Sequence, residues 1–357
     1  MLSELPILPA TRAFLERKLK MRIGADWQDA ASGRTLSFRN PATGEALARV
    51  PASSREDVDQ AIAAARRAFD DTDWATNVEK RVALVQKLYD LFDANRDRLS
   101  DLARYEAGAA IGAVGRAHVD MAMDGWKDYL AVFPQVRWET DYPPRMAFGF
   151  ESHRKAVHEP VGVVGAITPW NVPLYVNVGK VVAALLAGCT VILKPAPNTP
   201  GMGAIFGELA KEAGFPAGVL NVVFGSDPAL AGEMLVTDPR VDLISFTGST
   251  GIGKRIMEQG AATLKRVFLE LGGKLPSGIV HEAIGHAEGG NDLAGHRLVP
   301  LDAREVDVSI EAAPEFRRML QVLDRLVVLV PEVWTERRDR GLVHAELGHV
   351  HEALSDL

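Results

Sequence analysis

The sequence predicts an α/β fold whose centre is a doubly wound parallel sheet. From residue 161 onward, short runs rich in β-branched residues alternate with helical segments. Such alternation predicts right-handed βαβ crossovers and strands that are buried on both faces. Because ligands bind such sheets at the carboxyl ends of the strands, each polar or glycine-rich strand end is a candidate site.

Five runs are expected as the strands of this sheet, and the stretches between them as helices. The expected strands span residues 161–168, 190–194, 219–224, 241–247 and 267–271. The helical stretches centre on Ala183, Leu209, Ala231 and Ile256.

The chain upstream of the sheet is expected to be mainly helical. Residues 24–50 read as small strands around the turn-rich residues 40–44. Ser53 and Glu56 have the spacing of a capping box, which predicts a helix start near Ser54. Further helical stretches are expected at 79–104 and 115–132, and Pro143 and Pro144 end the helical pattern.

Composition favours a globular protein that handles small molecules. The 357 residues are 47% hydrophobic and 24% charged, with a net charge of -7. This charge gives no reason to expect nucleic acid or an anionic membrane as a partner. The apolar stretch 181–193 is too short to span a bilayer, and Glu4 ahead of a Pro-broken stretch does not fit a secretory signal. The expected location is the cytoplasm.

Cys189 is the one cysteine in the sequence. A single cysteine excludes a disulfide within the chain and any metal site with several cysteine ligands, in agreement with a reducing compartment. Cys189 stands at a helix-to-strand join, where an unpaired cysteine is expected to be buried as a small apolar residue.

The first strand end carries a candidate oxyanion donor. Asn171 lies between Pro169 and Pro173, and the two prolines hold its turn rigid. The amide N–H of Asn171 could stabilise an oxyanion formed when a nucleophile attacks a carbonyl. The alternative is an ordinary turn residue.

Two further strand ends carry features that suit a phosphorylated ligand. Lys194 ends an apolar strand, where it either contacts a ligand or extends to solvent. Residues 245–254 run from a strand through a glycine-rich turn into a helix, and N–H groups at a helix start attract phosphate. The window Gly248 to Lys254 nearly matches a nucleotide-binding P-loop, but Arg255 replaces the hydroxyl that would hold magnesium.

The last strand end carries a candidate base. Glu270 is followed by Gly272 and Gly273, which places a carboxylate beside flexible backbone. Such a carboxylate can activate water if burial raises its pKa, and the alternative is a solvated acid at a strand end.

These four strand-end motifs, in their order along the chain, resemble those of the aldehyde dehydrogenase superfamily, and the resemblance covers residues 23–274. The heptapeptide 268–274, Phe-Leu-Glu-Leu-Gly-Gly-Lys, is similar to the family's glutamate signature. The resemblance implies NAD(P)-dependent oxidation of an aldehyde to a carboxylic acid. It implies that Asn171 stabilises the tetrahedral intermediate and that Glu270 is the general base that hydrolyses the thioester.

The resemblance also implies a cofactor site for NAD or NADP. In the family, the lysine matching Lys194 contacts the adenosine ribose or its phosphate. A glutamate that often follows three residues later is Pro197 here, which leaves NAD and NADP both open. The implied cofactor-binding residues are Ile167, Thr168, Pro169, Trp170, Lys194, Pro197, Gly225, Phe246, Gly248, Ser249, Gly253, Leu271 and Gly272.

The sequence after Lys274 departs from the family. The family's nucleophilic thiolate lies C-terminal to the glutamate motif, and residues 275–357 hold no cysteine, no lysine and six histidines. His281, Glu282 and His286 miss the spacing of a zinc-binding H-E-x-x-H helix, so no metal site is expected. Our hypothesis is that a frameshift, fusion or abnormal ending has replaced the catalytic domain.

Together these observations predict four parts. They are an N-terminal helical part of the dinucleotide-binding domain (1–142), an oligomerisation-type hairpin (143–158), the parallel dinucleotide-binding core (159–274) and an unrelated tail (275–357). The family forms homo-oligomers through such a hairpin, but its partner strand is not recognisable here. Without the cysteine we expect no aldehyde turnover. The alternatives are a non-catalytic NAD(P)-binding or interaction protein and a P-loop NTPase.

Overall fold

Five parallel strands form the centre of the sheet and confirm the predicted fold class. The computed structural model describes residues 6–110, 114–225 and 227–272. The parallel strands are β7 (Val163–Ile167), β8 (Thr190–Lys194), β9 (Leu220–Val222), β10 (Leu243–Gly248) and β11 (Arg266–Leu271). The full order is β11-β10-β7-β8-β9-β1-β2, in which β1 (Met21–Ile23) and β2 (Asp26–Gln28) are antiparallel.

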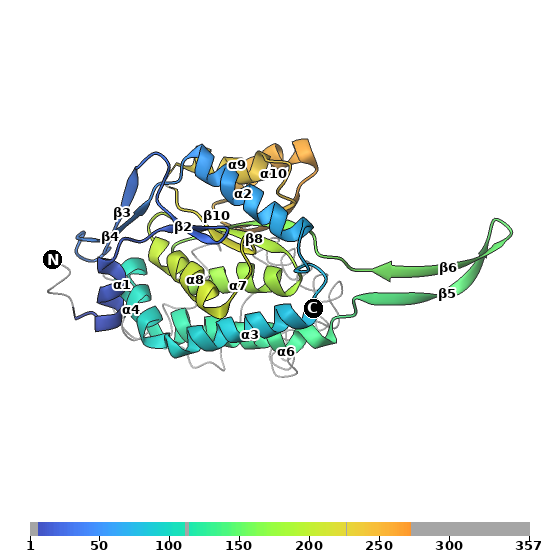
Figure 1. The fold of residues 1–357 in the computed structure, drawn as a ribbon, viewed down its shortest axis with the longest axis horizontal. Coiled ribbons are helices and arrows are strands. Elements are labelled where there is room, and N and C mark those ends of the chain that lie inside the picture. The colour runs from blue at the N-terminus through green and yellow to red at the C-terminus, as the bar shows by residue number, and fades with distance from the viewer. Residues whose placement is uncertain (1–5, 111–113, 226, 273–357) are drawn as a thin grey trace, which may run out of the picture. The chain divides into compact units, whose positions relative to one another are not determined.

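Helices cover both faces of this sheet (Figure 1). On one face lie α2 (Arg55–Asp70), α9 (Glu233–Thr237) and α10 (Thr250–Gly260). On the other lie α7 (Pro173–Leu186) and α8 (Pro200–Ala213), with α3 (Val78–Ala94), α4 (Arg96–Ala107) and α6 (Met121–Val132) outside them. Because helices cover both faces of the sheet, β8 is buried along its whole length, as expected for a strand of a parallel sheet.

The remaining elements are short. The helix α1 (Pro9–Glu16) packs beside α4, and β3 (Thr35–Arg39) pairs with β4 (Ala46–Pro51) around the predicted turn. The stretch expected to be helical at 79–104 is two helices that meet at Asn95, and a π-helical segment, Val114–Asp120, precedes α6. Single-turn segments lie at Phe133–Gln135, Pro228–Gly232 and Ala261–Thr263.

The predicted capping box of α2 is wrong by one residue. The Ser54 side chain accepts the N–H of Asp57, and the Asp57 carboxylate accepts the N–H of Ser54. Ser53 is instead buried, with its hydroxyl 3.0 Å from Met21 Sδ and accepting the N–H of Phe224 at 3.0 Å. Because Ser53 is held in the core, the next serine caps the helix.

Aromatic side chains join the outer helices to the sheet-facing helix α8. The rings of Phe92 and Phe206 have centroids 4.6 Å apart, and Trp126 stacks on Phe206 at 6.3 Å with nearly parallel planes. All three side chains are fully buried. Burial of each such ring stabilises the fold by about 2 kcal/mol or more, so the helical part before residue 133 belongs to the same core.

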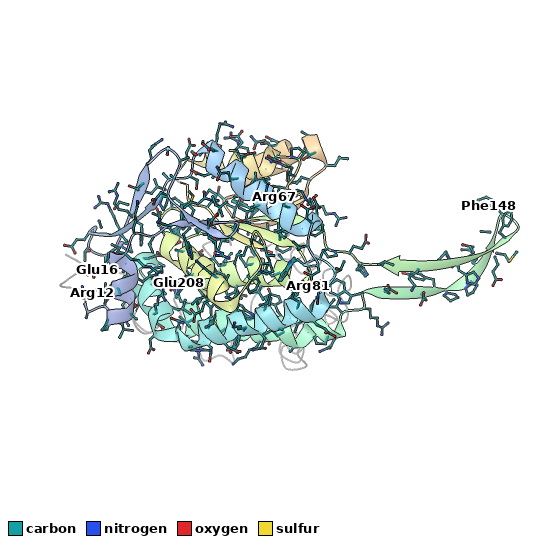
Figure 2. The ribbon with its side chains drawn as sticks, in the orientation of Figure 1. Arg12, Glu16, Arg67, Arg81, Phe148 and Glu208 are labelled. Atoms are coloured by element: carbon teal, nitrogen blue, oxygen red, sulfur yellow. The ribbon has the colours of Figure 1, made fainter. Side chains whose placement is uncertain are left out.

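A two-stranded arm extends from this body (Figure 1). It consists of β5 (Glu139–Ala147) and β6 (Phe150–Val157), so the hairpin begins at Glu139, ahead of its expected start at residue 143. Pro143 and Pro144 lie inside β5 at a register shift, where the ladder needs no N–H from them. Phe148 stands at the tip of the arm with a φ of 51° (Figure 2).

No helix among the described residues is long and apolar enough to cross a membrane. Residues up to Gly272 form one compact unit. Lys274, the tail 275–357 and its histidines lie outside the described residues.

Candidate functional site

The register of the parallel strands brings the predicted site residues to one edge of the sheet. Ile167 of β7 is paired with Lys194 of β8 on one side and with Phe246 of β10 on the other. Gly248 of β10 is in turn paired with Leu271 of β11. Ile167, Lys194, Gly248 and Leu271 are the last residues of their strands. They form one carboxyl edge, which is the ligand-binding edge of such sheets.

At this edge, β10 turns directly into α10. Ser249 caps the helix, with its hydroxyl accepting the N–H of Ile252 at 3.4 Å and its carbonyl accepting the N–H of Gly253 at 3.0 Å. Thr250 and Gly251 begin the helix and are exposed. The exposed first turn of a helix carries N–H groups and a positive dipole end, so it suits a phosphate.

Two glycines at this turn leave no room for a side chain. A β-carbon at Gly253 would lie 2.5 Å from Leu271 Cδ2, and one at Gly248 would lie 2.5 Å from the Phe246 ring. Gly272 continues the edge, with its N–H donating to the Gly248 carbonyl at 3.2 Å. The glycines therefore let the end of β11 and the start of α10 approach closely.

The same geometry counts against a P-loop. The near-match spans Gly248 to Arg255, but α10 already begins at Thr250. Most of the window is therefore helix, and only Ser249 separates the strand from it. A P-loop needs an extended loop whose N–H groups surround the phosphates, and no such loop exists here.

Lys194 is a buried cation at the end of β8. It is 7% exposed, and burial lowers the pKa of its ammonium to about 8. Its side chain runs towards the end of β9, since a β-carbon added at Gly225 would lie 3.9 Å from Lys194 Cε. The Thr168 N–H donates to the Lys194 carbonyl at 3.2 Å, which holds the turn after β7 against the end of β8.

The turn after β7 carries the candidate oxyanion donor. Asn171 and Trp170 are exposed there, and α7 begins two residues later at Pro173. Pro169 is half-buried, and the buried Thr168 hydroxyl has no partner among the described residues. The Asn171 amide is therefore open to a ligand.

The candidate base lies at the end of β11, the outermost strand of the described sheet on that side. Glu270 is paired with Thr247 and is exposed. Since only β10 separates β11 from β7, their ends are about 10 Å apart. Asn171 and Glu270 thus belong to one region, but the described residues do not bury Glu270.

Lys180 of α7 is a buried lysine near the candidate base that the sequence analysis did not identify. It is 6% exposed, and its Nζ lies 3.2 Å from the Ser245 hydroxyl and 5.5 Å from the centre of the Phe268 ring. Burial lowers the pKa of Lys180 to about 8, while the nearby charge of Glu270 raises it. The sequence feature that could have identified Lys180 is its position within the mainly apolar stretch 173–186.

Cys189 lies at the other edge of the sheet. It precedes the first residue of β8, whereas Lys194 ends that strand. Five residues of strand separate the two edges by about 17 Å. The Cys189 thiol is buried and its pKa is raised by that burial, so it is held as part of the core.

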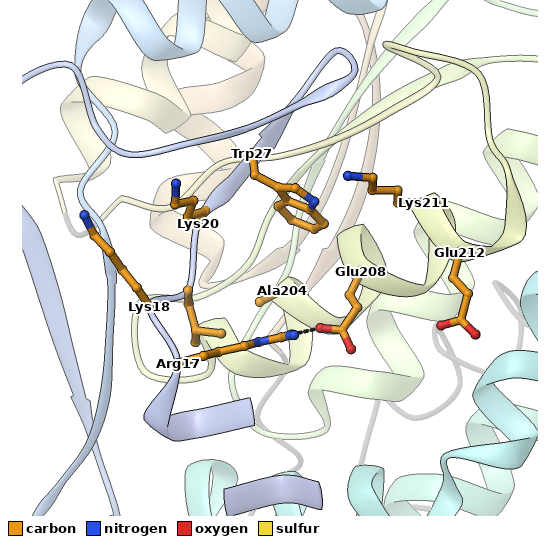
Figure 3. A pocket seen from close by; sticks show the side chains of 9 residues that line it. Arg17, Lys18, Lys20, Trp27, Ala204, Glu208, Lys211 and Glu212 are labelled. Atoms are coloured by element: carbon orange, nitrogen blue, oxygen red, sulfur yellow. Dashed lines mark ion pairs between the residues drawn. The ribbon is translucent and has the colours of Figure 1, made fainter. Parts of the chain in front are cut away.

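A hollow of about 640 Å³ lies away from this edge, beside β2 and α8 (Figure 3). Trp27 lies on one side of it, and an ion pair between Arg17 and Glu208 lies on the other. None of the predicted site residues lines it. Within the described ranges, no three histidine, cysteine or acidic side chains come together as a metal site.

Comparison with known proteins identifies two matches within the sequence. The sequence model of the aldehyde dehydrogenase family matches residues 27–285. That of a tetratricopeptide repeat matches residues 310–357, which lie outside the described residues.

Two relatives are about 40% identical to this chain over the residues that align. An aldehyde dehydrogenase of Enchytraeus buchholzi is 40% identical over 261 residues, covering 72% of this chain and 51% of the relative. The aminoacetaldehyde dehydrogenase of Pseudomonas aeruginosa is 38% identical over 281 residues, covering 76% of this chain and 54% of the relative. The chain thus spans about half the length of the curated relatives it matches.

Solved structures agree with the fold. The NAD+ complex of an aldehyde dehydrogenase from Bacillus cereus superposes with a TM-score of 0.71 at 37% identity. This match covers 80% of this chain and 58% of that structure.

Proposed function

This chain belongs to the aldehyde dehydrogenase family, and we propose that it binds NAD or NADP along the carboxyl edge of its sheet. The proposal rests on one observation. A buried lysine, Lys194, and the exposed first turn of α10 lie at the same edge of the sheet. A buried ammonium and a helix start both favour an anionic ligand. The NAD+-bound relative supports the same ligand class.

The described residues fit such a dinucleotide along its length. Ser249 and the first turn of α10 suit its pyrophosphate, and Gly248 and Gly253 allow the close approach that this needs. Lys194 and the exposed Pro197 suit its adenosine ribose. The nicotinamide half would meet the other edge residues, which are Ile167, Thr168, Pro169, Trp170, Leu271 and Gly272. Gly225 and Phe246 shape the floor of this edge beside Lys194 and Gly248.

The loop after β8 has a proline, Pro197, where an acidic side chain would bear on the choice between NAD and NADP. Pro197 is exposed at the position where an acidic side chain would repel the 2'-phosphate of NADP. Lys194 is a positive charge at the start of the same loop. We therefore propose that charge does not exclude NADP, so that NAD and NADP are both candidate ligands.

For the chemistry, the bound cofactor would supply a hydride acceptor. The Asn171 amide would donate a hydrogen bond to the oxyanion of an attacked aldehyde. Glu270 would accept a proton from water in the later hydrolysis. Lys180 lies close enough to Glu270 for the charge of the carboxylate to raise the pKa of the lysine, against the burial that lowers it.

We propose that the chain on its own does not oxidise aldehydes. Each covalent step of the family's reaction needs a thiolate, and the one cysteine is buried at the far edge. The test is NAD(P)H production from a panel of aldehydes by the wild type and by Cys189→Ala. We expect no production by either protein, and production by the wild type contradicts the proposal. Its loss in Cys189→Ala would then assign the nucleophile to Cys189, and its survival would assign it elsewhere.

The arm suits assembly with further copies of the chain. Phe148 is fully exposed at its tip, and Phe150 and Met146 are 76% and 66% exposed. Exposed apolar side chains grouped on one element mark a protein interface. We propose a homo-oligomer through the arm. Sedimentation of the wild type and of Phe148→Asp tests this, and a monomer in both would contradict it.

Without turnover the chain is a non-catalytic NAD(P)-binding protein, and with turnover it is an active dehydrogenase. Both functions use the same dinucleotide site. Calorimetric titration with NAD and NADP separates either function from a chain that binds nothing, and the aldehyde panel then separates the two functions.

A further inference from the structure

Glu106, near the end of α4, is a buried carboxylate that has no part in the function proposed above. It is 3% exposed, and its two oxygens each accept a backbone N–H from the start of α8. Gly201 donates to Oε2 at 2.7 Å and Met202 donates to Oε1 at 2.8 Å. Two helices whose contacting residues are 95 positions apart are thus joined through one side chain.

Glu106 supplies the N-terminal cap that the local sequence does not. Thr199 precedes α8 but makes no capping hydrogen bond, and its hydroxyl is buried without a partner in the described part of the chain. A carboxylate at a helix start satisfies free N–H groups and interacts favourably with the helix dipole. Burial raises the pKa of Glu106, and the two N–H groups lower it because they favour the ionised carboxylate.

The capped helix start is also one end of the loop 195–199. The other end of this loop is Lys194, which is fixed in β8. Pro195 packs on α8, since a β-carbon at Gly203 would lie 2.5 Å from Pro195 Cγ, and the Thr199 N–H donates to the Ala196 carbonyl at 3.1 Å. Pro197 stands exposed in the middle. The loop therefore keeps its shape only while both ends are held.

We infer that Glu106 is a positioning residue, which holds the loop 195–199 in the shape that binds the adenosine half of the cofactor. It touches no cofactor atom itself and acts through the start of α8. The inference rests on the proposed dinucleotide function, because the loop is assigned to adenosine there.

Removing the Glu106 oxygens tests the inference on the full chain. Glu106→Gln keeps one accepting oxygen and Glu106→Ala keeps none. With about 1 kcal/mol for each hydrogen bond lost, the dissociation constant for 5'-AMP rises about fivefold in the first variant and about 30-fold in the second. NAD+ weakens by the same factors, because only its adenosine half is affected. Hydrogen exchange at the Gly201 and Met202 amides becomes faster in the same order.

Gly201→Ala disturbs the contact from the other side. Its new β-carbon would lie 2.5 Å from Glu106 Oε2, so the carboxylate is pushed off the helix start and AMP binding weakens as in Glu106→Gln. Asp101→Asn is the matched control, because Asp101 is buried on the same helix but accepts the N–H of Leu8 at 2.8 Å. Its AMP affinity stays within about twofold of wild type when all the proteins are compared below their unfolding temperatures.

The results separate the inference from the function on which it rests. Wild-type AMP affinity in both Glu106→Ala and Gly201→Ala overturns the positioning role alone, and so does an equal loss in Asp101→Asn. A wild-type chain that binds neither AMP nor NAD+ overturns the proposed function and the positioning role with it.

Discussion

The adenosine side and the reaction side of the candidate site differ in how far the described residues enclose them. On the adenosine side, Lys194 is 7% exposed and the adjoining loop is tied to α4 through Glu106. On the reaction side, Trp170 is 56% exposed, and Asn171 and Glu270 are exposed as well. Burial fixes geometry and strengthens electrostatic interactions, so residues up to Gly272 favour cofactor binding over chemistry.

The largest effect we expect concerns the thiol that the reaction side would need. Cys189 is buried at the opposite edge and burial raises its pKa, so little thiolate is present or accessible. Labelling of the native chain by a thiol-specific reagent is expected to be at least about 100-fold slower than labelling after denaturation. Similar rates in both states would mean that Cys189 is reachable, and the contrast between the two sides would be lost.

The next largest effect is expected from removing Lys194, the buried cation on the adenosine side. Lys194→Ala is expected to weaken NADP+ binding by about 10- to 100-fold at pH 7. This is the loss of affinity expected when a hydrogen bond to a charged group is removed. Lys254→Ala is the control, because Lys254 is an exposed lysine on α10 behind the first turn. Calorimetric titration measures both. Equal affinities in the two variants would show that the dinucleotide does not use Lys194.

The pH dependence of binding gives a smaller effect. Because burial lowers the pKa of Lys194 to about 8, its charge is present below that pH and is lost above it. NADP+ affinity is therefore expected to be constant between pH 6.5 and 7.5 and to fall by up to about tenfold for each unit above 8.

Lys194→Arg checks that this pH dependence comes from Lys194 and not from Lys180, whose pKa is also lowered to about 8. Arginine keeps its charge, so the variant is expected to show a flat profile above pH 8. If the NADP+ affinity of this variant still falls above pH 8, the pH dependence would come from Lys180 on the reaction side instead.

The smallest effects are expected on the reaction side itself. Asn171→Ala and Glu270→Gln change exposed side chains, so the NAD+ dissociation constant should stay within about twofold of wild type. A loss of tenfold or more in either variant would show that this side is enclosed in the working protein and contributes to binding.

The edge of the sheet was predictable from sequence because its signals are local. A strand that ends in Lys194, or one that runs through Gly248 and Ser249 into a helix, is visible within ten residues. The parallel direction that puts these strand ends at one edge follows from the βαβ alternation, whereas the strand order was not predicted. The family resemblance then supplied the roles of Asn171 and Glu270.

What the sequence analysis missed depends on distant contacts. Glu106 contacts Gly201, which lies 95 positions away, and Lys180 of helix α7 has a lowered pKa because it is buried beside Ser245 of strand β10. The misplaced cap has the same cause, since the contact of Ser53 with Phe224 decides which serine caps α2. No local pattern contains such partners.

The most direct test of the central claim is calorimetric titration of the full chain with NAD+ and NADP+. We predict saturable binding of at least one dinucleotide, with one site per chain, that is weakened in Lys194→Ala and unchanged in Lys254→Ala. The absence of binding heat and of a thermal shift with both dinucleotides would contradict the claim that this edge of the sheet is a cofactor site.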